Sequence, residues 1–129
     1  MKKLLLLCLA LAGCSTAPKS KPTIQVDSEP PGAKVFFGAG ANTNRAAPKN
    51  FLGTTPFTWT PELDRDGRWD MPRISFYNNF GPQGVIVVEA RPADDATNLF
   101  PQSVIFRGAA AFRDSDPVPA RIFFDLRKK

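Results

Sequence analysis

The stretch VDSEPPGAKVFFG, residues 26–38, has the pattern of two β-strands joined by a tight turn. Before the turn, apolar or small residues at 24, 26 and 28 alternate with polar residues at 25 and 27, which is the period of a half-buried strand. In Pro30-Pro31-Gly32, proline fixes φ and glycine permits a positive φ. Residues 34–37 form a β-favouring run that Gly38 closes. The segment therefore predicts extended structure on both sides of a turn.

The β pattern continues to the end of the chain. Short β-favouring runs occur at residues 57–60, 74–76, 85–88, 104–106 and 122–124. After residue 23 no segment keeps the spacing of an amphipathic helix over three turns, and many of the 13 prolines interrupt the remainder. We therefore predict an all-β domain, either a small antiparallel β-sandwich or a partly open barrel. Its long loops, at 39–50, 61–72 and 92–103, are the predicted partner surfaces, because such loops are often functional.

Together with LGTTPF, residues 52–57, the first stretch resembles a PEGA domain, a small β-module named for a Pro-Glu-Gly-Ala signature. Pro31 stands here where that family has its glutamate. The resemblance implies that the signature residues shape turns; these are Pro30, Gly32, Ala33, Gly53, Thr54 and Pro56. It implies an extracytoplasmic module for adhesion, glycan contact or assembly, with no particular ligand. The chain departs from the family by the insertion at 38–51 and by the loop at 64–70.

The N-terminal segment has the layout of a secretory signal. Lys2 and Lys3 precede an apolar run at residues 4–12, which is shorter than the roughly 20 residues that span a bilayer. The sequence LAGC at 11–14 resembles the lipobox of bacterial lipoproteins. That resemblance implies cleavage between Gly13 and Cys14, a diacylglyceryl group on the Cys14 thiol and an N-acyl group on its amine. The alternative is an ordinary secretory signal in which Cys14 is incidental.

These features predict a signal peptide at 1–13, an acylated cysteine and tether at 14–22, and a PEGA-like β-domain at 23–129. Ser15 after the cysteine resembles the sorting pattern that sends lipoproteins to the outer membrane. We therefore expect a cell-membrane location by lipid anchor, at the periplasmic face of the outer membrane if the source is Gram-negative. Cys8 would leave with the signal and Cys14 would be alkylated, so no disulfide is expected.

Composition argues against several classes of function. The formal charge is +5, but loss of Lys2 and Lys3 would leave 15 basic against 12 acidic residues, an excess of only +3. We therefore expect no nucleic-acid partner. The chain contains no His, and its serines lie outside any nucleophile motif, so we predict no catalytic residues and no enzyme. A hydrolase that uses paired carboxylates is the least favoured alternative.

The loop DRDGRWD, residues 64–70, holds the candidate contact residues. Asp64, Asp66 and Asp70 are its candidate ligands for calcium. The loop lacks the third alternating acid and the distal glutamate of a calcium hand, and its arginines would repel a cation. We therefore predict an ion-paired turn, no metal site and no cofactor beyond the covalent lipid.

Exposed aromatic rings are the other candidates for ligand contact. Trp69, beside Arg68, and Phe80, in a turn-rich segment, would each offer a ring for a protein or glycan, although Trp69 could equally pack inside. The function predicted from the sequence is a membrane-anchored, non-enzymatic interaction or structural module of the cell envelope. The alternative is a module that binds peptidoglycan or lipopolysaccharide.

Overall fold

The computed structural model describes residues 21–70, 84–109 and 114–129. Three predicted features fall outside these ranges: the signal with Gly13 and Cys14, the strand at 74–76, and Phe80. The described residues form seven strands and no helix. They are β1 (Ile24–Glu29), β2 (Lys34–Gly40), β3 (Asn50–Thr54), β4 (Phe57–Trp59), β5 (Val85–Arg91), β6 (Gln102–Arg107) and β7 (Arg121–Asp125).

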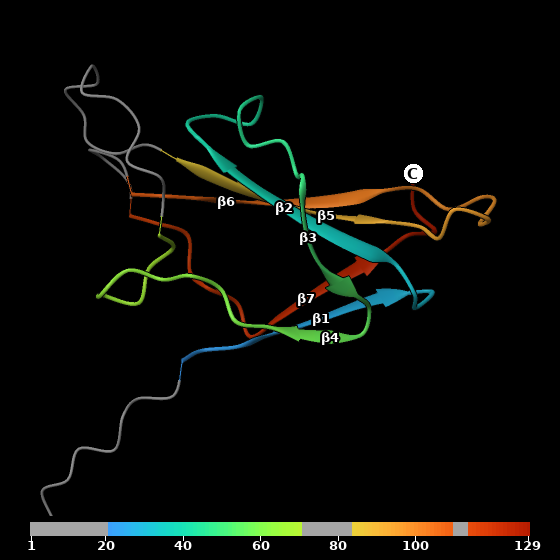
Figure 1. The fold of residues 1–129 in the computed structure, drawn as a ribbon, viewed down its shortest axis with the longest axis horizontal. Helices are drawn as coiled ribbons and strands as arrows, with labels where there is room; N and C mark the ends of the chain where they lie inside the picture. Colours follow the sequence, from blue (N-terminus) through green and yellow to red (C-terminus); the bar gives the residue numbers. More distant parts are fainter. Residues whose placement is uncertain (1–20, 71–83, 110–113) are drawn as a thin grey trace, which may run out of the picture.

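The strands build two sheets, which lie one above the other as the layers of a β-sandwich (Figure 1). One sheet has three strands in the order β4-β1-β7, and the other has four in the order β3-β2-β5-β6. The predicted all-β sandwich is thus confirmed, and the described strands do not close into a barrel. All strand pairs are antiparallel except β1 with β7, which run parallel.

The turn at 30–33 joins the two layers. β1 belongs to the three-stranded sheet and β2 to the four-stranded sheet, so the stretch 26–38 is a crossover between sheets rather than a hairpin. Gly32 adopts the expected positive φ of 95°, which a glycine tolerates without strain. A second crossover, at Thr55 and Pro56, leads from β3 back to β4.

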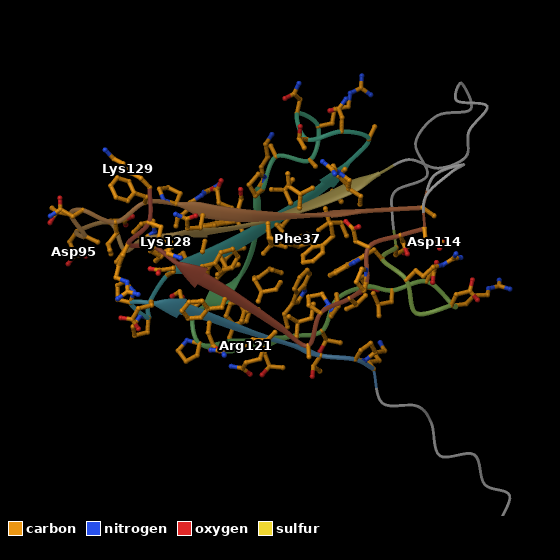
Figure 2. All side chains as sticks on the ribbon, turned by 180° about the vertical axis from the view of Figure 1, so that it is seen from behind. Phe37, Asp95, Asp114, Arg121, Lys128 and Lys129 are labelled. Atoms are coloured by element: carbon orange, nitrogen blue, oxygen red, sulfur yellow. The ribbon has the colours of Figure 1, made fainter. Side chains whose placement is uncertain are left out.

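The core lies between the two sheets, and the predicted alternation places its side chains there. Along β1, Ile24, Val26 and Ser28 are buried while their neighbours are exposed or half-buried. The other buried apolar residues of the core are Ala33, Val35, Trp69, Ile86, Val88, Ala90, Phe106, Ile122, Phe124 and Leu126. Phe37 is half-buried and packs against this core in the space between the sheets (Figure 2).

Part of the insertion at 38–51 is β-strand, and the rest is a loop that folds over the four-stranded sheet. Its last two residues begin β3, an edge strand that the sequence pattern does not distinguish from the loop. Between β2 and β3, the loop returns over Gly38 and Gly40. A Cβ on Gly38 would lie 2.1 Å from the carbonyl oxygen of Ala47. Arg91 of β5 also donates a hydrogen bond to the Pro48 carbonyl at 2.9 Å, so the loop is fastened to the sheet that it covers.

Candidate functional site

The loop after β4 closes on itself through Asp64. The backbone N–H of Asp64 donates to the Arg68 carbonyl at 2.8 Å, and Gly67, at a φ of 76°, donates to the Asp64 carbonyl. The Asp64 carboxylate in turn accepts the backbone N–H groups of Asp66 and Arg68, both at 2.9 Å. This is the side-chain-to-backbone pattern by which aspartate stabilises turns. The turn holds the loop in one shape and thereby directs the residues that follow it.

Arg68 forms ion pairs with both acids of the turn, Asp64 and Asp66. Its guanidinium lies 3.3 Å from Asp64 and 2.9 Å from Asp66, as expected for the predicted ion-paired turn. The pKa of the Asp64 carboxyl lies below its ordinary value of 3.8, chiefly because the backbone N–H of Arg68 donates a hydrogen bond to it. Within the described ranges, no three His, Cys, Asp or Glu side chains are grouped to hold a metal ion.

Trp69 points the other way, into the sandwich. Its side chain is 2% exposed and stacks on Phe106 with ring centroids 4.6 Å apart. Of the two alternatives that the sequence left open, packing is the one found. Arg68 stays half-exposed in its ion pairs whereas Trp69 is buried, so the structure does not bring these two candidates together at the surface. The reason is that neighbouring residues of an extended segment face opposite sides, and Trp69 is bridged to Leu63 in such a segment.

The indole of Trp69 has one unusual property. Its Nε1 is buried and has no hydrogen-bond partner among the described residues. A buried donor without an acceptor costs roughly 1–3 kcal/mol. The burial of the large ring against Phe106 and Trp59 outweighs this penalty, since burying such a ring contributes more than the donor loses.

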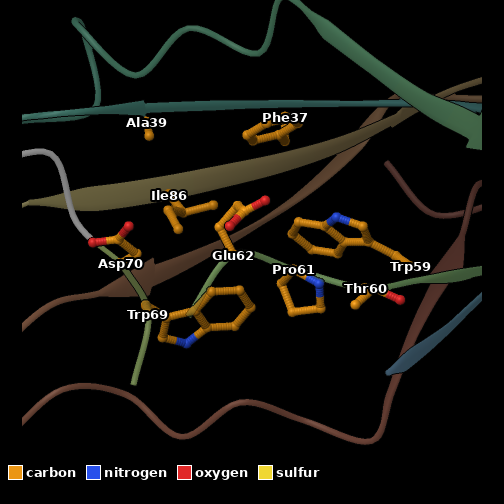
Figure 3. A pocket seen from close by; sticks show the side chains of 9 residues that line it. All are labelled: Phe37, Ala39, Trp59, Thr60, Pro61, Glu62, Trp69, Asp70 and Ile86. Atoms are coloured by element: carbon orange, nitrogen blue, oxygen red, sulfur yellow. The ribbon is translucent and has the colours of Figure 1, made fainter. Parts of the chain in front are cut away.

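Beside Trp69, the open end of the sandwich contains a cavity of about 450 Å³ (Figure 3). Both sheets contribute to it. β2 and β5 supply one wall, while β4 and the segment after it supply the other. The lining residues are Phe37, Ala39, Trp59, Thr60, Pro61, Glu62, Trp69, Asp70 and Ile86.

The walls of the cavity are largely aromatic, and the charged residues that the structure describes in its lining are acidic. The Phe37 and Trp59 rings lie 5.9 Å apart, and Trp59 lies at the same distance from Trp69. Glu62 and Asp70 are the charged residues of the lining, and both are exposed. Neither carboxylate forms an ion pair with a residue that the structure describes. The arrangement therefore combines ring faces with uncompensated negative charge.

Sequence reasoning found only part of this site. The β-favouring run at 57–60 predicts the strand that carries Trp59, and Trp59 packs against the core. The sequence pattern marks Asp70 only as a candidate metal ligand, and nothing in the pattern marks Glu62. The lining comes from positions between 37 and 86 that share no motif, so only the folded chain shows that they meet.

Comparison with known proteins identifies no relative of this chain. No family model matches the chain, and neither a curated protein nor a solved structure matches it. In the part of the chain that the structure describes, no helix has the length and apolar character needed to cross a membrane.

Proposed function

We propose that this protein is a membrane-anchored bacterial lipoprotein whose β-sandwich serves as a non-enzymatic interaction or structural module of the cell envelope. The observation that carries the proposal is the order of the N-terminal segment: two lysines, a short apolar run, LAGC and a polar tether. The first strand, β1, begins shortly after that tether at Ile24. The domain thus follows directly on the segment that would anchor it.

The resemblance to PEGA domains supports the second half of the proposal. Of its signature residues, Pro30, Gly32, Ala33 and Pro56 lie in the two crossovers between the sheets, and Gly53 and Thr54 end β3. In the first crossover Gly32 has a positive φ and Ala33 is 1% exposed. Gly53 also fits, because a Cβ there would approach the Phe57 ring to 3.0 Å. These positions shape the sandwich and leave the loops for contacts with partners.

The proposed anchor would hold the domain near the membrane. Each buried methylene of an acyl chain contributes about 0.8 kcal/mol, so one chain binds marginally and several bind stably. A flexible tether of about eight residues has a reach of roughly 15 Å. Lys21 and Pro22, at its end, line a hollow together with loop residues 60–67. Because residues 60–62 also line the aromatic cavity, that cavity lies at the end of the domain to which the tether is attached. Ser15, directly after the cysteine, favours the outer membrane if the source is Gram-negative.

Metabolic labelling with a fatty-acid analogue tests the anchor. The full chain should incorporate the label, and Cys14→Ala should lose it because the thiol that receives the diacylglyceryl group is gone. Cys8→Ala is the matched control and should label like the unaltered chain, since Cys8 lies before the cleavage site. Label that persists in Cys14→Ala would overturn the lipoprotein assignment. Membrane fractionation of the labelled protein then distinguishes the inner from the outer membrane.

The alternative of a glycan-binding module stays a prediction. Of its predicted contact residues, Trp69 is 2% exposed, Arg68 forms ion pairs with Asp64 and Asp66, and Phe80 lies outside the described residues. A glycan would have to use the cavity instead, so an oligosaccharide is one of the probes in the experiment below.

A further inference from the structure

The charged residues described around the aromatic cavity are acidic, although the protein as a whole carries a positive charge. The protein carries a formal charge of +5, yet the residues that the structure describes around the cavity include two acids, Glu62 and Asp70, and no lysine or arginine. Six other described acids each lie within 3.6 Å of an arginine or lysine nitrogen; these are Asp27, Asp64, Asp66, Glu89, Asp94 and Asp125. Two carboxylates at the rim of one cavity, without an ion pair to any described residue, attract a cation to that place.

The rest of the lining determines what kind of cation fits. The Phe37, Trp59 and Trp69 rings, with Ile86 and Pro61, form mostly apolar walls, which favour an aliphatic ligand over a hydrated metal ion. The faces of indole rings attract ammonium and guanidinium groups through their quadrupole. A long methylene stem that ends in a positive charge satisfies both the walls and the rim.

We propose that this cavity binds a lysine or arginine side chain of a partner protein in the envelope. The stem lies along the cavity wall that the neighbouring Phe37 and Trp59 rings form, and the charged group lies at the rim beside the carboxylates of Glu62 and Asp70 (Figure 3). The inference rests on the proposed function as an interaction module and names the chemistry of its partner. A lipid headgroup fits less well, because the phosphate beside its amine would be repelled by the same two carboxylates.

The protein carries its own reporter of binding. It contains two tryptophans, Trp59 and Trp69, and both line the cavity. We would titrate the full chain, in micelles of a neutral detergent, with N-acetyl-lysine methylamide and N-acetyl-arginine methylamide and follow the indole fluorescence. A single side chain is a fragment of the full contact, so saturation is expected in the millimolar range. N-acetyl-norleucine methylamide is the matched uncharged probe and should bind more weakly.

Variants of the rim test the role of the carboxylates. Glu62→Gln and Asp70→Asn keep the size of the side chain and remove its charge, so each should weaken lysine binding about three- to fivefold. Added salt should weaken binding to the unaltered chain in the same direction. Asp95→Asn is the matched control. Asp95 lies at the end of the molecule away from the 61–70 loop (Figure 2), and its loss should leave the affinity unchanged.

Three results would overturn the inference. These are the absence of any fluorescence change with both basic probes, equal binding of the lysine and norleucine probes, and equal lysine affinity in Glu62→Gln, Asp70→Asn and the unaltered chain. Tighter binding of an oligosaccharide of N-acetylglucosamine would assign the cavity to glycan instead. Tighter binding of phosphatidylethanolamine vesicles would assign it to lipid. Because the titration does not depend on acylation, its failure would leave the anchor proposal standing, and the reverse also holds.

Discussion

Thr55 shows at the scale of single residues how the two crossovers are joined. Its Oγ1 accepts the backbone N–H groups of Gly32 and Ala33, at 3.1 and 3.0 Å. The Ser28 hydroxyl donates its one proton to the Pro30 carbonyl at 2.7 Å. The proton between Ser28 and Thr55, whose oxygens are 2.5 Å apart, must therefore come from Thr55. Thr55, in the connection between β3 and β4, thus provides hydrogen-bond partners for the backbone of the turn at 30–33.

Thr55→Val tests this network. Valine keeps the shape of the side chain but removes the hydroxyl that accepts from the Ala33 N–H and donates to the Ser28 oxygen. The free energy of unfolding should therefore fall by about 1–3 kcal/mol. Urea unfolding measures the change. Thr58→Val is the control, because Thr58 is exposed and its hydroxyl bonds only to a surface glutamine; we expect a change within about 0.5 kcal/mol. Equal losses in both variants would contradict the role of Thr55.

At the scale of elements, the loop between β2 and β3 acts as a cover for the four-stranded sheet. Ala46, within this loop, is fully buried, and its N–H donates to the Asn42 carbonyl at 2.9 Å. The loop backbone approaches the strand closely only because Gly38 has no side chain. The insertion that departs from the PEGA pattern therefore has a structural role on the outer face of the sheet, at a distance from the cavity between the layers.

Gly38→Ala tests the close approach. The added Cβ would meet the Ala47 carbonyl oxygen at 2.1 Å, and relieving that overlap should cost about 1–3 kcal/mol in the free energy of unfolding. Hydrogen exchange of the Ala46 N–H should also speed up, because the loop must move off the sheet. Ser103→Ala, at an exposed position of the same sheet, serves as the control and should change neither quantity. Unaltered exchange in Gly38→Ala would show that the loop is not held there.

At the scale of the whole molecule, the last strand completes the sheet of the first. β7 pairs in parallel with β1 from Gln25 with Arg121 to Glu29 with Asp125. An ion pair of 2.8 Å joins Asp27 to Arg121, which lie 94 residues apart in the sequence. The three-stranded sheet therefore cannot form until nearly the whole chain is present, which is a large loop-closure cost for folding.

Removal of residues 120–129 tests this dependence. The truncation takes away three buried core side chains, those of Ile122, Phe124 and Leu126. Each contributes about 2–5 kcal/mol, which together approaches or exceeds the total stability of a small domain, about 5–15 kcal/mol. We expect no cooperative urea transition. Removal of residues 128–129 alone is the control and should preserve that transition; cooperative unfolding of both proteins would contradict the requirement for β7.

The sequence by itself determined the local part of this protein. Alternation in residues 24–28 predicted which side chains of β1 face the core, and the turn residues predicted the positive φ of Gly32. Period and turn chemistry act between residues a few positions apart, so one segment is enough to read them. The proposed anchor at Cys14 likewise depends on a contiguous motif.

Only the tertiary structure decided how the strands are shared between sheets and what meets at the cavity. Nothing local distinguishes a crossover from a hairpin at 30–33, because sheet membership depends on pairings such as that of β1 with β7. The inward direction of Trp69 depends on its stacking with Phe106 of a distant strand. Glu62 and Asp70 line one cavity with Phe37 and Trp59 only because the fold brings these residues together. Long-range packing, which no short segment encodes, sets each of these outcomes.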